Sequence, residues 1–148
     1  MSEISEHIGL PVGVLRYDVF RDGVLIETVE EKNLIVDGAK GVLSALLGGA
    51  VSGKSITKIG FGTNGAPPAA GNTSLTGAYV KAVDSVSYPS TSSVRFNFSL
   101  GTSEANGTAI IEFGLITADN TLFSRRVRSS AINKASDISF TGTWTITF

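Results

Sequence analysis

Two short glycine-rich patterns in this sequence are ones that bind phosphate groups in other folds. Residues 48–55, GGAVSGKS, satisfy G-x-x-x-x-G-K-[ST], and residues 60–65, GFGTNG, satisfy G-x-G-x-x-G. Both patterns bind phosphate only between a strand and the N-terminal end of a helix, where free backbone N–H groups and the helix dipole face the anion. Either pattern therefore needs the order strand, loop, helix.

The segments around both patterns argue against a nucleotide site. A helix signal precedes residues 48–55, so this loop faces the negative C-terminal end of a helix. Residues 55–61 alternate polar and apolar side chains, which is typical of a strand. The second pattern leads into Ala66-Pro67-Pro68, and the proline pair favours an extended chain. We interpret both patterns as connections between elements and expect no bound cofactor.

Other residue types that could carry catalysis are scarce. The single histidine, His7, lies close to the N-terminus, and the sequence contains no cysteine. A Ser-His-Asp arrangement or a histidine-rich metal site is therefore not expected, and no acidic residues have the spacing of a calcium loop. We predict no catalytic residues, no metal ligands and no enzymatic activity, and a phosphate-loop enzyme ranks last among the hypotheses.

One carboxylate lies within an apolar run. Residues 108–117, TAIIEFGLIT, are typical of a strand buried on both faces, and an unpaired Glu112 there would be costly to bury. The next strand offers three cations, Arg125, Arg126 and Arg128, and we predict a structural ion pair between Glu112 and Arg125. Arg126 and Arg128 share the other face of that strand, where contact with a partner or protection of a sheet edge is the favoured use.

One helix is predicted, over residues 37–48. Asp37 is placed to cap its N-terminus, and Gly48 to end it in the left-handed conformation. The apolar residues between them recur at helical spacing and predict one buried face packed on a sheet. These residues are Ala39, Val42, Leu43, Leu46 and Leu47.

The rest of the chain predicts about eight strands, hence a mainly β protein with an antiparallel β-sandwich. In the last strand we expect Ile138, Phe140, Trp144, Ile146 and Phe148 to be buried, with a phase shift near Gly142. The long loop 63–76 exceeds the usual length for a connection and is a candidate functional segment. The predicted strands are residues 12–20, 24–29, 56–61, 79–88, 94–100, 108–117, 122–127 and 138–148.

Length and charge limit the possible partners. The 148 residues suit one domain, residues 10–148, preceded by an N-terminal arm, residues 1–9, that needs a partner surface to become ordered. A net charge of −1 favours neither nucleic acid nor an anionic membrane. The N-terminus lacks the apolar core of a signal peptide, and no apolar run is long enough to cross a bilayer. We expect synthesis in the cytoplasm, without a nucleic-acid or membrane partner.

Three segments together resemble small structural proteins of tailed bacteriophages and prophages. They are residues 33–49, NLIVDGAKGVLSALLGG, residues 56–75, ITKIGFGTNGAPPAAGNTSL, and residues 104–125, EANGTAIIEFGLITADNTLFSR. In that group a helix is followed by a GxG-T-x-G-x-x-P loop, and later by N-G-x-x-I-x-E-F-G-L and L-F-x-R. The resemblance covers residues 10–148 and implies a virion component made in the host cytoplasm.

Two functions are compatible with this resemblance. The first is a capsid decoration (cement) protein, a homo-oligomer such as a trimer, that binds the major capsid protein of the assembled head. The second is a tail component, either a fibre or baseplate adaptor or a receptor- or carbohydrate-binding module, with tail proteins as partners. Candidate contact residues lie in the arm, in the long loop and on the arginine strand. They are Ile4, His7, Ile8, Asn64, Pro67, Pro68, Arg126 and Arg128.

Overall fold

The computed structural model describes residues 11–148, which form nine antiparallel strands and one helix. The strands follow one another in the order β4-β3-β7-β8-β2-β1-β9-β6-β5. The bounds are β1 Val12–Arg21, β2 Val24–Ile35, α2 Gly38–Gly48, β3 Ile56–Gly62, β4 Tyr79–Ala82, β5 Ser85–Ser90, β6 Ser93–Leu100, β7 Ala109–Thr117, β8 Leu122–Asn133 and β9 Ile138–Thr147. Over these residues the prediction of a mainly β, sandwich-type fold with one helix is confirmed.

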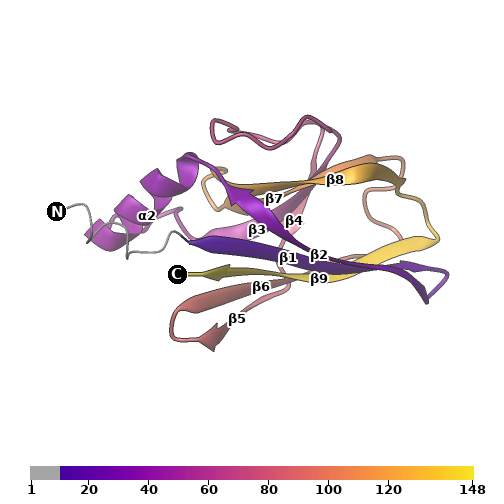
Figure 1. Cartoon of the computed structure of the whole chain (residues 1–148), viewed down its shortest axis with the longest axis horizontal. Coiled ribbons are helices and arrows are strands. Elements are labelled where there is room, and N and C mark those ends of the chain that lie inside the picture. Colours follow the sequence, from indigo (N-terminus) through magenta and orange to yellow (C-terminus); the bar gives the residue numbers. More distant parts are fainter. Residues whose placement is uncertain (1–10) are drawn as a thin grey trace.

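The curled sheet has two halves that face each other (Figure 1). The first half-sheet is β5-β6-β9-β1-β2, and the second is β4-β3-β7-β8. Within residues 11–148, the strand pairing that joins them is that of Leu34 and Ile35 of β2 with Arg125 and Ser124 of β8. Away from this point β2 remains paired with β1 and β8 remains paired with β7, so the two half-sheets diverge.

Aromatic side chains from both halves meet in the core. Phe61 of β3 and Phe113 of β7 lie against Phe140 of β9, with ring centroids 6.2 and 6.3 Å apart. Tyr17 of β1 packs on Phe113 at 4.8 Å. Aromatic pairs at these separations add to the stabilisation from burying their area. The halves are therefore held face to face mainly by this cluster, together with the aliphatic residues around it.

The helix lies at one end of the sandwich (Figure 1), and its predicted ends and face need three corrections. Asp37 has helical backbone angles and makes no side-chain cap; its carboxylate lies 3.4 Å from Lys40 Nζ instead. The left-handed residue is Gly49, with φ of 86°, one position later than predicted. Leu47 is 90% exposed although it continues the apolar spacing, since it lies in the last turn of α2. Leu46 is exposed as well.

The predicted strand 79–88 is two strands on different halves. β4 pairs with β3 at one edge, whereas β5 pairs with β6 at the other. Between them Val83 N–H bonds Thr57 C=O, and Asp84 N–H bonds Asn97 C=O, so the chain crosses from one half-sheet to the other. This step breaks the alternation, because the core-facing positions change from odd numbers up to Val83 to even numbers from Val86, and the prediction of one strand overlooked this break. β2 and β8 also extend six residues beyond their predicted ends at 29 and 127.

The final strand keeps a single phase, so the predicted shift near Gly142 is wrong. The register of β9 with β1 is continuous from Arg21–Ile138 to Val12–Thr147. Gly142 therefore faces the core, where a Cβ would lie 2.5 Å from Phe98 Cζ and 2.6 Å from Arg16 O. Ile138, Phe140, Trp144 and Ile146 are buried, but Phe148 is 57% exposed because it follows the last paired residue.

We predict that Gly142→Ala lowers the free energy of unfolding by about 2–3 kcal/mol, because the added methyl group overpacks a core bounded by backbone. The matched control is Gly41→Ala in α2, where a Cβ meets nothing within 4 Å and helix propensity predicts a gain of up to about 1 kcal/mol. Urea unfolding monitored by Trp144 fluorescence measures both. Equal stability of Gly142→Ala and the unsubstituted chain would contradict this packing.

Candidate functional site: a buried ion pair that holds the long loop

The two residues predicted to form an ion pair lie together on the outer face of the second half-sheet. Arg125 Nε donates to Glu112 Oε1 at 2.8 Å, and their side chains are 1% and 0% exposed. Arg125 lies opposite Gly114 in register, and Gly114 is two residues from Glu112 on β7. The side chains of Glu112 and Arg125 therefore point to the same outer face. Two charges so deeply buried are stable only when their remaining hydrogen-bonding atoms also find partners.

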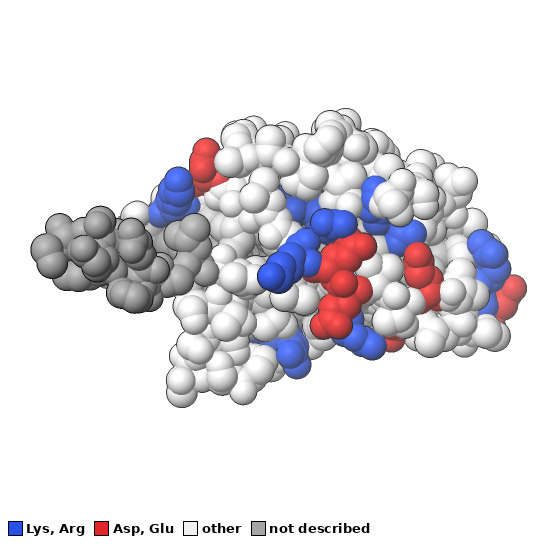
Figure 2. Space-filling model, in the orientation of Figure 1, with Lys and Arg blue, Asp and Glu red and all other residues white. Residues whose placement is uncertain are grey.

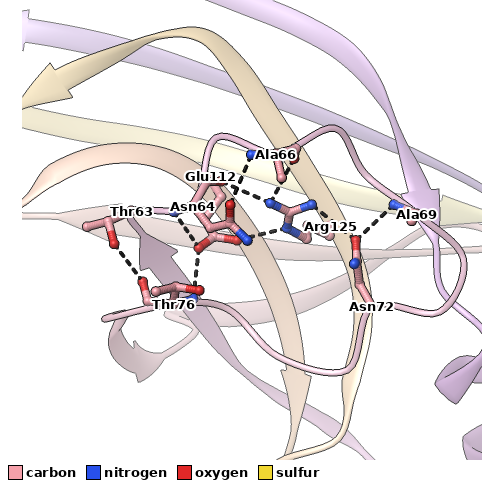
Figure 3. A network of polar contacts seen from close by, with 8 residues as sticks. All are labelled: Thr63, Asn64, Ala66, Ala69, Asn72, Thr76, Glu112 and Arg125. Carbon is pink, nitrogen blue, oxygen red and sulfur yellow. Dashed lines mark hydrogen bonds and ion pairs between the residues drawn. The ribbon is translucent and has the colours of Figure 1, made fainter.

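Glu112 finds those partners in the backbone of the long loop (Figure 3). Its Oε2 accepts N–H bonds from Asn64 and Thr76, each at 2.9 Å. These residues lie close to the two ends of the loop, and Thr63 N–H also bonds Thr76 C=O at 2.9 Å. One carboxylate thus fixes the two ends of the loop together on β7.

Arg125 binds the middle of the same loop (Figure 3). Its Nη2 donates to the carbonyls of Asn64 and Ala66, at 2.9 and 3.1 Å. Its Nη1 donates to Asn72 Oδ1 at 3.1 Å, and that oxygen also accepts the Ala69 N–H. A planar guanidinium with five donors suits this arrangement in a way that a lysine ammonium does not.

Glycines in β3 and β7 leave space beneath the loop for close packing. Gly60 of β3 and Gly114 of β7 are opposite each other in register, and Leu75 packs on both. A Cβ on Gly60 or Gly114 would lie 2.6 or 2.9 Å from Leu75 Cδ1. Likewise, a Cβ on Gly62 would lie 2.5 Å from Glu112 Oε2. The G-x-G of residues 60–62 therefore makes room for this leucine and this carboxylate.

The loop also reaches the helix. Asp37 N–H donates to Ala70 C=O at 2.8 Å, where the chain enters α2. The long loop thus connects three parts of the fold: the ends of β3 and β7, the buried arginine on β8, and the start of α2. Its outward side presents mostly small and polar residues, with Pro67 exposed and Pro68 half-buried.

Arg126 and Arg128 lie along the seam where β8 and β2 separate, and both bind within the chain. Arg126 forms an ion pair with Glu31 and donates to Lys32 C=O at 3.2 Å. Arg128 pairs with Glu27 at 3.0 Å and lies over the ring of Tyr17. Figure 2 shows a group of Lys, Arg, Asp and Glu side chains in the middle of one face. The contacts of Arg126 and Arg128 bridge the two half-sheets, which adds a structural role to the predicted partner contact.

The lysine of the first glycine-rich pattern is also held within the chain. Helix α2 precedes this turn and β3 follows it, as predicted. Lys54 Nζ lies 2.8 Å from Asp119 Oδ2 in the β7–β8 turn. This bond, followed by those from Thr117 and Thr121, holds the pKa of the Asp119 carboxyl well below its usual range. Lys54 therefore joins two turns of the fold.

An apolar groove of about 510 Å³ opens at the helix end of the sandwich. Its walls come from α2, β3, β5, β6 and β9 and include Leu43, Ile56 and Val94. Four of the lining side chains are large, apolar and exposed, of which Tyr88 is 76% and Phe148 57% exposed. We call this region the apolar end surface, and it comprises Leu46, Val86, Tyr88 and Phe148.

Three of the predicted contact residues, Ile4, His7 and Ile8, lie outside the described residues, as does the whole of the predicted arm, residues 1–9. Within residues 11–148, no three His, Asp or Glu side chains gather in a way that could hold a metal ion. Over the same residues, no helix is both long and apolar enough to span a membrane.

The chain was compared with protein-family models, with curated proteins and with solved structures, and none of them matches it.

The ion pair was predicted from the sequence, but its attachment to the long loop was not. Two features indicate such an attachment. One carboxylate and one guanidinium cannot satisfy all of each other's hydrogen-bonding atoms, and the loop after β3 is unusually long. The apolar end surface was missed because Leu46 and Phe148 fit the phase of buried positions. Helical or strand phase does not indicate where the rest of the fold ends.

We predict that Arg125→Met lowers the free energy of unfolding by about 3–5 kcal/mol, because it leaves the Glu112 carboxylate buried without its charged partner. Cleavage by a broad-specificity protease within residues 63–78 should become faster in the same variant. Arg21→Met is the control, since the Arg21–Asp137 pair is exposed at 59% and 42% and contributes about 1 kcal/mol or less. A loss of unfolding free energy in Arg125→Met no larger than in Arg21→Met would contradict the role of the Glu112–Arg125 pair in holding the loop.

Proposed function

We propose that this chain is a structural protein of a tailed-phage virion, and that it decorates and stabilises the assembled head. The resemblance of residues 33–49, 56–75 and 104–125 to small phage structural proteins suggests the setting. The observation that carries the proposal is the apolar end surface, which surrounds a groove of about 510 Å³. Contiguous apolar surface of this kind marks a contact with another macromolecule more often than it marks free surface.

The long loop supports the proposal as a second contact. It is exposed on its outer side, yet Glu112 and Arg125 fix both its ends and its middle. A loop that is already ordered loses little conformational entropy when it binds, so more of its contact energy appears as affinity. A protein that bridges neighbouring capsid subunits benefits from such rigidity because it resists their separation.

The mechanism of stabilisation follows from mass action. A protein that binds the assembled shell, but not its free subunits, shifts the equilibrium toward the shell by an amount set by its concentration relative to Kd. This requires no chemistry at the contact and no change within the bound protein. The apolar end surface supplies the affinity, and the fixed loop supplies a second point of contact.

A carbohydrate-binding role in the tail is the second candidate, and a specific observation favours it. Tyr88 and Phe148 line a shallow groove of about 390 Å³ together with Thr91, Ser92 and Ser93. Exposed aromatic rings beside hydroxyl groups are the surface that a sugar ring requires, with an apolar face and polar edges. Binding of the chain to host cells rather than to heads would favour this role.

Co-sedimentation with emptied, expanded shells of a tailed-phage major capsid protein tests the proposal. We expect saturable binding, and Val86→Glu should weaken it at least about tenfold because a charge then faces an apolar contact. The matched control is Val24→Glu at the β1–β2 turn, which is 64% exposed at the opposite end of the molecule (Figure 1). That control should bind normally.

Binding to tails or host cells without binding to shells would refute the decoration role. Equal loss of shell binding in Val86→Glu and Val24→Glu would refute the assignment of the contact to the apolar end surface.

A further inference from the structure

A lysine is enclosed at the base of the loop between β6 and β7. Lys134 follows β8 and is 2% exposed. Its Nζ donates to Asn106 Oδ1 at 2.9 Å and to Ala135 C=O at 3.1 Å. The backbones are fixed as well, because Gly107 N–H bonds Lys134 C=O and Lys134 N–H bonds Thr108 C=O, each at 2.9 Å. The amine and the amide are thus held in contact by four hydrogen bonds.

Burial also affects the charge of this amine. Desolvation lowers the pKa of Lys134, and the nearby carboxylates of Glu104 and Asp137 oppose the shift only in part. A larger fraction of Lys134 is therefore a neutral amine than would be the case for an exposed lysine. A neutral lysine amine is a nucleophile, and desolvation is one of the ways in which proteins activate it.

The amide of Asn106 is placed to receive such an attack. Its carbonyl oxygen is bound by the amine, so its Cγ lies within about 4 Å of Nζ. A small rotation of the amide brings the two atoms to the roughly 3–3.5 Å from which bonds form. Its Nδ2 donates to Thr102 C=O at 3.0 Å on the exposed side of the loop. A leaving ammonia therefore has a direct path to solvent.

We propose that Lys134 and Asn106 form an intramolecular amide bond in the folded chain. The neutral Nζ attacks Asn106 Cγ, the new C–N bond forms, and the carbonyl electrons move to Oδ1. The intermediate then collapses, the bond from Cγ to Nδ2 breaks, and Nδ2 leaves as ammonia with one proton from the attacking nitrogen. The product is a secondary amide, and no oxidant, metal or other reactant is needed.

The bond would act as a covalent staple. It would join the β6–β7 loop to the link between β8 and β9, two segments 28 residues apart. A crosslink that closes a chain segment of this length stabilises the fold chiefly by restricting the unfolded chain, as a disulfide does. A chain without cysteine has no disulfide to serve this purpose.

The chain contains its own comparison pair. Lys58 Nζ also donates to an asparagine, at Asn120 Oδ1, and to Ala118 C=O. This pair is exposed, whereas Lys134 is enclosed. If contact between a lysine and an asparagine were sufficient, both pairs would react. If enclosure of the amine is required, only Lys134 reacts.

Intact mass spectrometry of the purified full chain, aged at pH 8 after folding, tests the proposal. The expected result is a loss of one ammonia, about 17 Da, and a branched tryptic peptide that joins Asn106 to Lys134. Lys134→Arg and Asn106→Ala should each keep their full mass, whereas Lys58→Arg should still lose one ammonia. A chain held in urea from synthesis onward should not react, because the contact depends on folding.

Three results would overturn the proposal. They are an unchanged mass after ageing, a gain of about 1 Da from hydrolysis of the Asn106 amide, and a branched peptide through Lys58. Each can be read from the unsubstituted chain, so the conclusion does not depend on whether a variant folds.

Discussion

The buried ion pair between Arg125 and Glu112 is the constraint on which this structure depends most. Neither group can be dehydrated alone, and their mutual contact uses only one oxygen of the carboxylate and one nitrogen of the guanidinium. The remaining atoms bind backbone groups and one side chain of residues 63–78. The second half-sheet therefore has a stable outer face only when this loop is in place, and loop and sheet must form together.

The glycines of β3 and β7 follow from the same constraint. Residues 60–65 match a dinucleotide-binding pattern, yet Gly60 and Gly62 lie within a strand, under Leu75 and beside the Glu112 carboxylate. Glycine is required here for close approach, as it is in a nucleotide-binding loop, but the approaching group belongs to the chain itself. The first glycine-rich pattern, residues 48–55, is comparable, since Lys54 binds Asp119 in a neighbouring turn.

Much of the fold could be predicted from the sequence, because alternation marks strands and helical spacing marks α2. Phase read over whole segments, however, did not separate β4 from β5, since the break in alternation between Val83 and Val86 is a single step between two strand-like stretches. Phase also could not show that Leu47 and Phe148 lie beyond the packed region. The Glu112–Arg125 contact was predictable from the cost of burying a charge. The hydrogen bonds by which the two side chains hold the loop depend on tertiary geometry.

Together these features describe a rigid body with distinct surfaces. The seam between β8 and β2 is bridged by Arg126 and Arg128, the loop is fixed by Arg125, and one end remains apolar and open. Hydrogen exchange at the Asn64 and Thr76 amides tests the central claim most directly, since both donate to Glu112 Oε2. We expect protection comparable to that of the paired amides of β7, lost only on global unfolding. Exchange at the rate of an open loop, with β7 still protected, would contradict the account.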